Sequence, residues 1–504
     1  MTGRSSTGLG RLVRLGFDEP ARARDLLAHP ALATLTAHES AVDDLAIAAD
    51  PDLALAALLR VAEGAQDPAR AEAVAALLAR LRDDPDARRL GYAVLGLSEA
   101  LGDHLARHPD HVGVLLGQAA LERPGREDLV ADLLLAVGAD PADPTPVASL
   151  PTADALDALR VAYRRRVLAL AARDLAGGEP VDVVAAELAD LADAVLETGL
   201  AIARADLPAG AAPCRLAVVG MGKSGGRELN YVSDVDVVFV AEALDPGDGS
   251  VPDEEAALRT ATRLATGMMN ACSAVTREGS IWQVDAGLRP EGKSGALVRT
   301  LRSHLGYYER WASTWEFQAL LKARPSAGDL ELGAAYVDAV LPLVWSAADR
   351  DGFVEDVQAM RRRVVDTIPA KEAGRELKLG PGGLRDVEFA VQLLQLVHGR
   401  SDVMLRSPTT LVALEALATW GYVGRDDAAT LGAAYRFERT LEHRIQLHRL
   451  RRTHLVPEAE ADLRRLGRSL GLRTDPVAEL DEQWRRHARE VRRLHEKLFY
   501  RPLL

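Results

Sequence analysis

Residues 215–240 read RLAVVGMGKSGGRELNYVSDVDVVFV and decide the fold of this 504-residue chain. The stretch begins and ends with β-rich apolar runs, and glycines at positions 222, 225 and 226 lie between them. Such runs favour strands and such glycines favour a turn, so we predict a strand, a turn that leads into a helix, and a second strand. A helix at about 254–275 and a strand over 281–288 complete a predicted α/β unit of roughly 115 residues.

Three acids fall at the ends of these predicted strands. Side chains alternate between the faces of a strand, so Asp234 and Asp236 share one face, and Asp285 follows on a later strand. Neighbouring carboxylates repel each other and stay ionised most easily around a divalent cation, and Mg²⁺ also binds phosphate oxygens. An isolated Asp-x-Asp is usually two solvated acids. Three acids on adjacent strands instead predict a magnesium site for in-line phosphoryl transfer.

The glycines between the two strands predict close approach of the backbone to a phosphate. Their spacing is not that of a Walker loop, because GxxxxGK[ST] is missing. It is also not a dinucleotide-binding fingerprint, because no acid closes a second strand about 20 residues later. Strand, glycine turn, helix, SDxD and a third Asp together resemble the organisation of nucleotidyltransferases with a polymerase-β-like palm.

The segments on both sides of this unit have helical periodicity. Apolar residues recur three and four positions apart from about residue 20 to 206 and again after about residue 330, while the proline-rich segment 138–151 predicts a loop. We therefore expect an α+β, predominantly helical protein. Its expected parts are a helical region over 1–210, the nucleotidyltransferase core over 211–330 and a helical bundle over 331–504.

Composition excludes several classes of function. The formal net charge of −13 argues against a surface that wraps nucleic acid or lies on anionic lipid, although seven basic residues and only four acids lie between Asp285 and Arg324. Two cysteines, Cys214 and Cys272, are too few for a disulfide framework. No signal-peptide core and no apolar run of about 18 residues is present, so we expect a cytoplasmic protein without nucleic-acid or membrane partners.

Residues 220–240, GMGKSGGRELNYVSDVDVVFV, resemble the motif GMGKxGGxELNxxSDxDxxF of the bacterial bifunctional glutamine synthetase adenylyltransferase/adenylyl-removing enzymes. Further stretches similar to this family are GLSEALGDHLARHP (96–109), VDAGLRPEGKSGALV (284–298), TWEFQALLKAR (314–324), ELKLGPGGLRDVEFAVQLLQL (376–396) and LEHRIQLHRLRRTHLVP (441–457). They follow in order over most of the chain.

The resemblance implies one half of an enzyme with two similar halves. One half attaches AMP from ATP to a tyrosine of glutamine synthetase. The other removes it by phosphorolysis, in which phosphate attacks the AMP phosphorus and gives ADP and free tyrosine. The removing half comes first in the family, and this chain begins at Met1 and ends abruptly, so we expect adenylyl removal. ATP-dependent adenylylation is the alternative, because TWEFQALLKAR is close to the transferring half. A free-standing single-half enzyme and a non-catalytic module that binds nitrogen-signalling PII proteins also remain open.

The resemblance also implies roles for individual residues. Asp234, Asp236 and Asp285 would hold Mg²⁺, and the residues that would line the phosphate side are Gly220, Gly222, Lys223 and Ser233. Arg289 would either bind phosphate or form a structural ion pair. Gly287 stands where the family commonly has an arginine, which removes one possible phosphate contact.

The segment that begins at Gly382 has two interpretations. Its glycines and Arg385 could bind an anion and Glu388 could reach the metals, or Asp386 could simply cap the helix. Lys322 and Arg324 would similarly meet phosphate or solvate a helix end. The 12 histidines show no zinc-ligand spacing, and His443 and His448 are interpreted as surface or packing residues.

Overall fold

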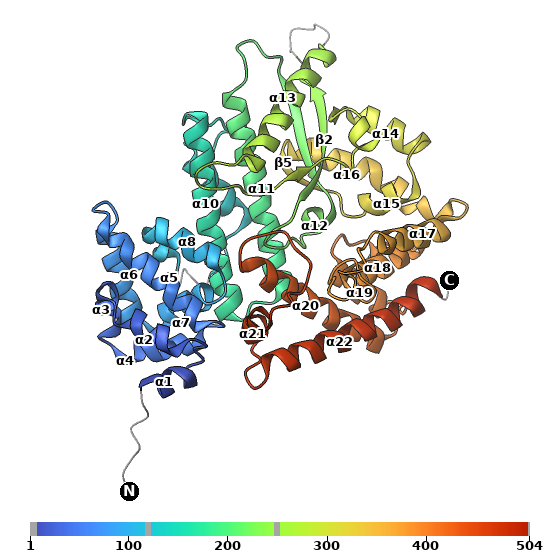
Figure 1. The fold of residues 1–504 in the computed structure, drawn as a ribbon. Coiled ribbons are helices and arrows are strands. Elements are labelled where there is room, and N and C mark those ends of the chain that lie inside the picture. The colour runs from blue at the N-terminus through green and yellow to red at the C-terminus, as the bar shows by residue number, and fades with distance from the viewer. Residues whose placement is uncertain (1–7, 116–121, 246–251, 502–504) are drawn as a thin grey trace. The chain divides into compact units, whose positions relative to one another are not determined.

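The computed structural model describes residues 8–115, 122–245 and 252–501 (Figure 1). These residues form two compact units. The first unit contains the described parts of Met1–Arg123, Arg164–Val184 and Thr440–Arg485, and the second those of Pro124–Tyr163, Ala185–Arg439 and Arg486–Leu504. Helices predominate and one five-stranded mixed sheet is present, which confirms the expected α+β class. The expected boundaries near residues 210 and 330 stay a prediction.

The sheet lies in the second unit and has the strand order β3-β2-β1-β5. β1 (Cys214–Gly220) pairs antiparallel with β2 (Val235–Ala243) on one side and with β5 (Arg324–Gly328) on the other. β3 (Val284–Asp285) and β4 (Val298–Arg299) run parallel to β2. The two long predicted strands are confirmed, whereas the strand predicted over 281–288 is only two residues long. β4 and β5 were not predicted. The sequence of β5, RPSAG, has none of the residues that favour strands.

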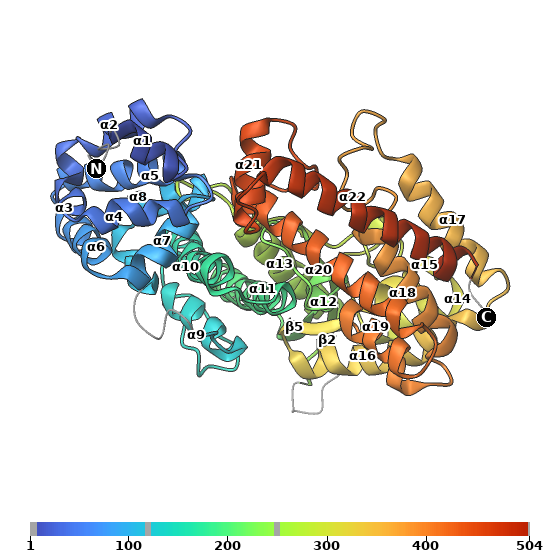
Figure 2. The same cartoon turned by 90° about the horizontal axis from the view of Figure 1, so that it is seen from below.

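Helices cover both faces of the sheet. α13 (Glu254–Ser273), which confirms the helix predicted at about 254–275, and α16 (Leu330–Trp345) both contact β1 and β2. Figure 2 shows the two helices on opposite sides of the strands. Each face is therefore buried, which explains why β1 and β2 are apolar along most of their length.

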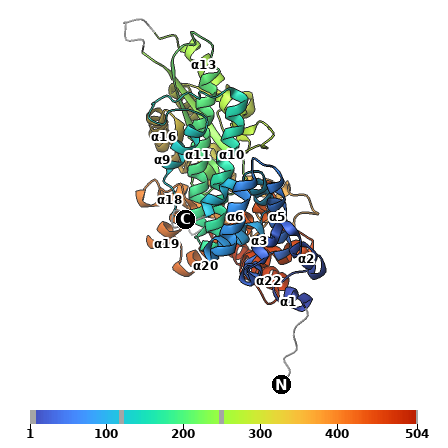
Figure 3. The same cartoon turned by 90° about the vertical axis from the view of Figure 1, so that its left-hand side faces the viewer.

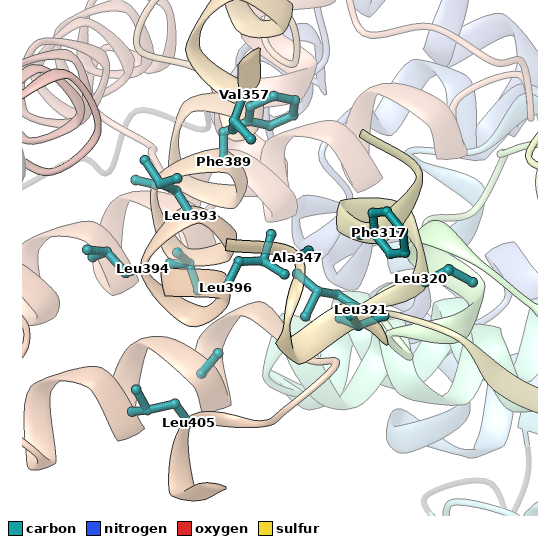
Figure 4. Close-up of a cluster of buried hydrophobic side chains, with 14 of the residues drawn as sticks. Phe317, Leu320, Leu321, Ala347, Val357, Phe389, Leu393, Leu394, Leu396 and Leu405 are labelled. Atoms are coloured by element: carbon teal, nitrogen blue, oxygen red, sulfur yellow. The ribbon is translucent and has the colours of Figure 1, made fainter. Parts of the chain in front are cut away.

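A large apolar core joins the sheet to the helices that follow it. It contains Val219 of β1, Tyr336 of α16 and Leu393 of α18 (Leu384–His398). Figure 4 shows part of this core, where Phe389 of α18 lies beside Val357 of α17 (Phe353–Asp366). The residues that follow the sheet thus pack against it in one unit.

The helical stretch Leu330–Asp349 is long and apolar enough to cross a membrane by length and composition. Tyr336, Val340 and Val344 of this stretch are fully buried in the core just described. Packing against the sheet is therefore sufficient to explain its apolar character.

The remaining helices confirm the predicted helical pattern. Those that lie wholly in the first unit are α1 (Gly8–Arg14), α2 (Pro20–Leu27), α3 (Ala33–Thr36), α4 (Glu39–Asp43), α5 (Pro51–Glu63), α6 (Ala71–Asp83), α7 (Pro85–Leu95), α8 (Glu99–Arg107) and α21 (Glu460–Ser469). Figure 3 shows α2, α3, α5 and α6 packed together. α5 begins where Pro51 follows Asp50, whose carboxylate accepts a hydrogen bond from the Leu53 N–H at 2.9 Å. Proline in the first turn and an aspartate cap are favourable at this position.

The second unit adds shorter helices around the sheet. They are α9 (Arg126–Ala136), α12 (Gly222–Gly225), α14 (Leu301–Arg310), α15 (Thr314–Leu320) and α19 (Thr410–Thr419). Four described helices contain residues of both units, namely α10 (Thr152–Ala172), α11 (Val181–Ala205), α20 (Arg425–Leu447) and α22 (Pro476–His495). The predicted loop over 138–151 contains no helix.

Candidate functional site

The three predicted acids converge at the start of β2. Asp236 pairs with Asp285 across the parallel β2–β3 ladder, and Asp234 immediately precedes β2. One carboxylate oxygen from each acid lies within 4.8 Å of the others, and each side chain is half-buried. Among the described residues, no other group of His, Cys, Asp or Glu has this spacing. We call Asp234, Asp236 and Asp285 the acid cluster.

The pKa of Asp236 is raised by its position in the acid cluster. Burial raises the pKa of Asp236 to about 6, and the charges of Asp234 and Asp285 add to this effect, while Lys223 and Lys378 lower it. A carboxylate under this repulsion is stabilised by a cation among its neighbours. The donor set consists only of carboxylate oxygens, which suits a hard divalent cation better than zinc or copper. The acid cluster can therefore hold a metal ion.

Two glycines allow the residues after β1 to approach this cluster. Gly222 has a φ of +52°, and a Cβ atom there would lie 2.6 Å from Asp236 Oδ2. A Cβ atom at Gly220 would lie 2.4 Å from Ser326 Oγ on β5. The backbone N–H of Met221 donates to the Asp236 carbonyl at 2.8 Å. Residues 220–229, which we call the glycine turn, are thus fixed directly against the acid cluster.

Lys223 and Ser233 also lie beside the acid cluster. Lys223 Nζ donates to Asn230 Oδ1 at 2.5 Å, and its charge acts on Asp236. Ser233 is buried, and its Oγ donates to Asp234 Oδ1 at 3.3 Å. Lys223 is therefore held near the acids, whereas Ser233 orients one of them.

The loop after Asp285 is built around Gly287 and Arg289. The Gly287 N–H donates to Asp285 Oδ1 at 2.7 Å, and a Cβ atom there would lie 2.8 Å from this oxygen. The Arg289 guanidinium donates to the carbonyls of Ala286 at 2.8 Å, Lys293 at 3.1 Å and Gly295 at 3.1 Å. Of the two predicted roles for Arg289, the geometry favours the structural one, although its partners are backbone carbonyls and not an acid.

The segment that begins at Gly382 also favours the structural interpretation. Asp386 accepts hydrogen bonds from the Gly382 N–H at 2.6 Å and from Arg361 Nε at 2.7 Å. Arg385 Nη1 lies 3.4 Å from Glu388 Oε2. Glu388 is buried and lies outside the acid cluster. Burial opposes its ionisation, but the pKa of Glu388 is lowered because the surrounding cations, Arg385 first, outweigh that effect.

Lys322 and Arg324 have buried acids as partners. Lys322 Nζ donates to the Glu228 carboxylate and, at 3.2 Å, to Thr410 Oγ1. Arg324 Nη1 donates to Asp193 Oδ2 at 2.6 Å. Neither partner was predicted, and no short-range pattern could have identified Asp193, which lies 131 residues from Arg324. Two of the seven basic residues between Asp285 and Arg324 are thus neutralised by buried acids.

Lys378 was also missed by the sequence analysis. Its charge acts on both Asp236 and Glu388, and its backbone carbonyl accepts a hydrogen bond from the Arg385 N–H at 2.9 Å. The only available signal was a lysine two residues before a glycine-rich turn, which is a common surface pattern.

Comparison with known proteins gives two family matches. Residues 89–339 match the model of the glutamate-ammonia ligase adenylyltransferase family. Residues 358–499 match the model of the GlnD PII-uridylyltransferase family. The first match contains the whole sheet and the acid cluster, and the second contains α18, α19 and α20.

The chain is also similar to curated proteins named bifunctional glutamine synthetase adenylyltransferase/adenylyl-removing enzyme. The one from Streptomyces coelicolor is 60% identical over 506 residues, which cover 100% of this chain and 48% of that protein. The one from Cutibacterium acnes is 50% identical over 90% of this chain and 45% of its own length. The one from Mycobacterium tuberculosis is 49% identical over 98% and 46%. The chain thus spans about half the length of the curated relatives it matches.

Proposed function

Because this chain belongs to the glutamate-ammonia ligase adenylyltransferase family of nucleotidyltransferases, we propose that it transfers AMP to or from a tyrosine of glutamine synthetase. The observation that carries the proposal is the acid cluster, which lies at the start of β2 and on the neighbouring strand β3, next to the glycine turn. We propose the removing direction: adenylyl-tyrosine and phosphate give ADP and tyrosine. The protein would act in the cytoplasm, beside its protein substrate.

The residues of the chain bind and orient in this reaction. Asp234, Asp236 and Asp285 would hold Mg²⁺, which would neutralise charge on the reacting phosphoryl group. Lys223 would bind an oxygen of the same group. A phosphate oxygen bonds to the AMP phosphorus while the bond from phosphorus to the tyrosine oxygen breaks, and that oxygen takes a proton. No side-chain nucleophile is required, so positioning and charge stabilisation supply the catalysis.

ATP-dependent adenylylation is the alternative direction. The tyrosine oxygen bonds to the α-phosphorus of ATP and loses its proton, while the bond between the α- and β-phosphates breaks and pyrophosphate leaves. Both reactions proceed at the phosphorus of AMP, so the acid cluster could serve either of them.

A second candidate function is the binding of a nitrogen-signalling PII protein. The observation that favours it is the match of residues 358–499 to a PII-uridylyltransferase family. Such binding would regulate the transfer of AMP or, in a non-catalytic module, replace it. The non-catalytic alternative would be favoured by two results together: PII binding that Asp236→Asn leaves unchanged, and no turnover by the wild type.

One preparation assayed in both directions tests these alternatives. Glutamine synthetase carrying labelled AMP is mixed with phosphate, Mg²⁺ and the protein, with and without PII protein, and labelled ADP is measured. Unmodified glutamine synthetase with labelled ATP is the second arm. We expect ADP in the first arm, loss of ADP in Asp236→Asn, and full activity in Glu331→Gln, a matched change at a carboxylate that is 97% exposed. Label transfer only in the second arm would establish adenylylation.

A further inference from the structure

Asp193 of α11 is a fully buried carboxylate that binds two arginines. Arg324 Nη1 donates to its Oδ2 at 2.6 Å and Nη2 to its Oδ1 at 3.0 Å, which is a bidentate pair. Arg126 Nε donates to Oδ2 at 2.9 Å. The side chain of Asp193 is 0% exposed, and those of Arg324 and Arg126 are 19% and 28% exposed. Bidentate geometry fixes the plane of the Arg324 guanidinium.

The same guanidinium reaches the glycine turn. Arg324 Nη2 donates to the Ser224 carbonyl at 3.1 Å, and its Nε donates to the Gly225 carbonyl at 3.3 Å. At Gly225 the backbone is packed so closely that a Cβ atom would lie 1.8 Å from the Lys322 carbonyl. Arg324 therefore connects a buried acid of a distant helix to two consecutive carbonyls of the turn.

The other side of the glycine turn is held by residues from the C-terminal half of the chain. Thr409 Oγ1 donates to the Gly226 carbonyl at 3.0 Å. Arg439 Nη2 donates to the carbonyls of Glu228 at 2.6 Å and Leu229 at 3.1 Å. Four carbonyls besides that of Ser224 thus accept hydrogen bonds from side chains outside the turn. The turn has little freedom to move away from the acid cluster.

We propose that Asp193 and Arg324 are positioning residues, which hold the glycine turn where it binds the phosphate groups of the nucleotide. Gly222 and Lys223 can meet such an anion only while the turn stays against Asp236, and Arg324 fixes the two carbonyls that directly follow them in the chain. Asp193 acts through Arg324, since it neutralises and orients the guanidinium. The nature of the ligand rests on the proposed function, whereas the mechanical role of Asp193 and Arg324 rests on the hydrogen bonds alone.

The test compares Arg324→Lys with Arg126→Met. Both variants remove an arginine from Asp193, but Arg126 makes no hydrogen bond to the glycine turn; its second acceptor is the Ser326 carbonyl at 2.7 Å. The Kd for MgADP is measured by calorimetry, together with KM for phosphate, kcat and Tm. We expect Arg324→Lys to raise Kd and KM about tenfold, since an error of about 1 Å in position costs up to a hundredfold. Arg126→Met should lower Tm to a similar extent and leave Kd within about twofold.

Equal changes in Kd for the two variants would overturn the proposal, because Asp193 and Arg324 would then act only through stability. If Arg324→Lys does not fold, Thr409→Val decides, since it removes one hydrogen bond to the Gly226 carbonyl at nearly constant volume. An increase of Kd by about threefold is expected there, and an unchanged Kd would overturn the proposal. A wild-type protein that binds MgADP without turnover in either direction would contradict the proposed function, while the Kd values would still test the positioning role.

Discussion

Two sets of three acids in the second unit differ in what surrounds them. The members of the acid cluster face one another, with carboxylate oxygens within 4.8 Å. The other set, which we call the α11 acids, follows one helix at spacings of three and four and consists of Asp190, Asp193 and Glu197. Each α11 acid accepts from donors on other elements, namely Arg227 at 2.7 Å, Arg126 and Arg324 at 2.9 and 2.6 Å, and the Gly328 N–H at 2.6 Å.

The different surroundings of the two sets show that buried acids can serve either a structural role or a binding role. The α11 acids are neutralised by arginines, in the case of Glu197 by Arg204 of the same helix. Their hydrogen bonds to Arg324 and to the Gly328 N–H join the helix to the sheet. The acid cluster is dominated by burial and by its own like charges, which raise the pKa of Asp236. Like charges gathered at half-buried positions cost stability, and they are expected where a cation binds.

Asp236→Asn tests the metal-binding role of the acid cluster, and its effect on kcat is the largest that we expect. It removes a metal ligand while keeping the shape of the side chain. We expect kcat to fall about a thousandfold, because loss of the metal removes several kcal/mol of charge stabilisation from the transition state. Tm should stay constant or rise, because one of three repelling charges is gone. Steady-state assays and thermal unfolding of both proteins measure the two effects, and a kcat within tenfold of the wild type would contradict the assignment.

Asp193→Asn tests the structural role of the α11 acids. The amide leaves Arg126 and Arg324 without their buried counter-charge, so the free energy of unfolding should fall by about 3 kcal/mol. The kcat at saturating phosphate and MgCl₂ should change less than tenfold. Urea denaturation measures the stability, and Glu331→Gln is the exposed control. If Asp193→Asn kept its stability and lost turnover, Asp193 would have a catalytic role like that of the acid cluster, and the contrast between the two sets would be wrong.

The pH dependence of Mg²⁺ binding sharpens the comparison. Asp236 has a pKa of about 6 in the metal-free fold against a reference value of 3.8, so the proton competes with the cation. Apparent Mg²⁺ affinity should fall about tenfold per pH unit below this value and level off above it. Calorimetric titrations at several pH values between 5 and 8, which lie on both sides of the pKa of Asp236, measure the Mg²⁺ affinity. An affinity independent of pH would contradict the raised pKa.

The raised pKa of Asp236 also makes the stability of the metal-free fold depend on pH. The folded state holds the Asp236 proton more tightly than the unfolded chain, so this group stabilises the fold fully below pH 3.8. The contribution is lost as the pH rises through about 6. Without Mg²⁺, the Tm of the wild type should therefore decrease more between pH 5 and pH 7 than that of Asp236→Asn.

Arg289→Lys has the smallest expected effect. The lysine cannot reproduce three donations to the carbonyls of residues 286, 293 and 295. Because the loop follows Asp285, we expect a loss of about 1 kcal/mol in stability and a change of KM for phosphate below about threefold. An increase in KM of about thirtyfold with unchanged Tm would restore the interpretation of Arg289 as a phosphate ligand.

The acid cluster could be predicted from the sequence because its geometry is local. Alternation along a strand fixes the relation of Asp234 to Asp236, and Asp285 required only that its strand be a neighbour. β5 was missed because RPSAG acquires its strand conformation by pairing with β1 and not by propensity. The pairing of Asp193 with Arg324 was out of reach for the same reason: only the fold brings the two residues together. Glu388 resembled a metal ligand in the motif, and its cationic surroundings come from four different positions in the chain.

Manganese binding tests the central claim most directly, because Mn²⁺ replaces Mg²⁺ and is visible by electron paramagnetic resonance. The wild type, Asp236→Asn and Asp193→Asn are titrated with Mn²⁺ without nucleotide, and free Mn²⁺ is measured. We expect bound Mn²⁺ in the wild type, its loss in Asp236→Asn and its retention in folded Asp193→Asn. Retention of Mn²⁺ in Asp236→Asn, or its loss in folded Asp193→Asn alone, would contradict the account.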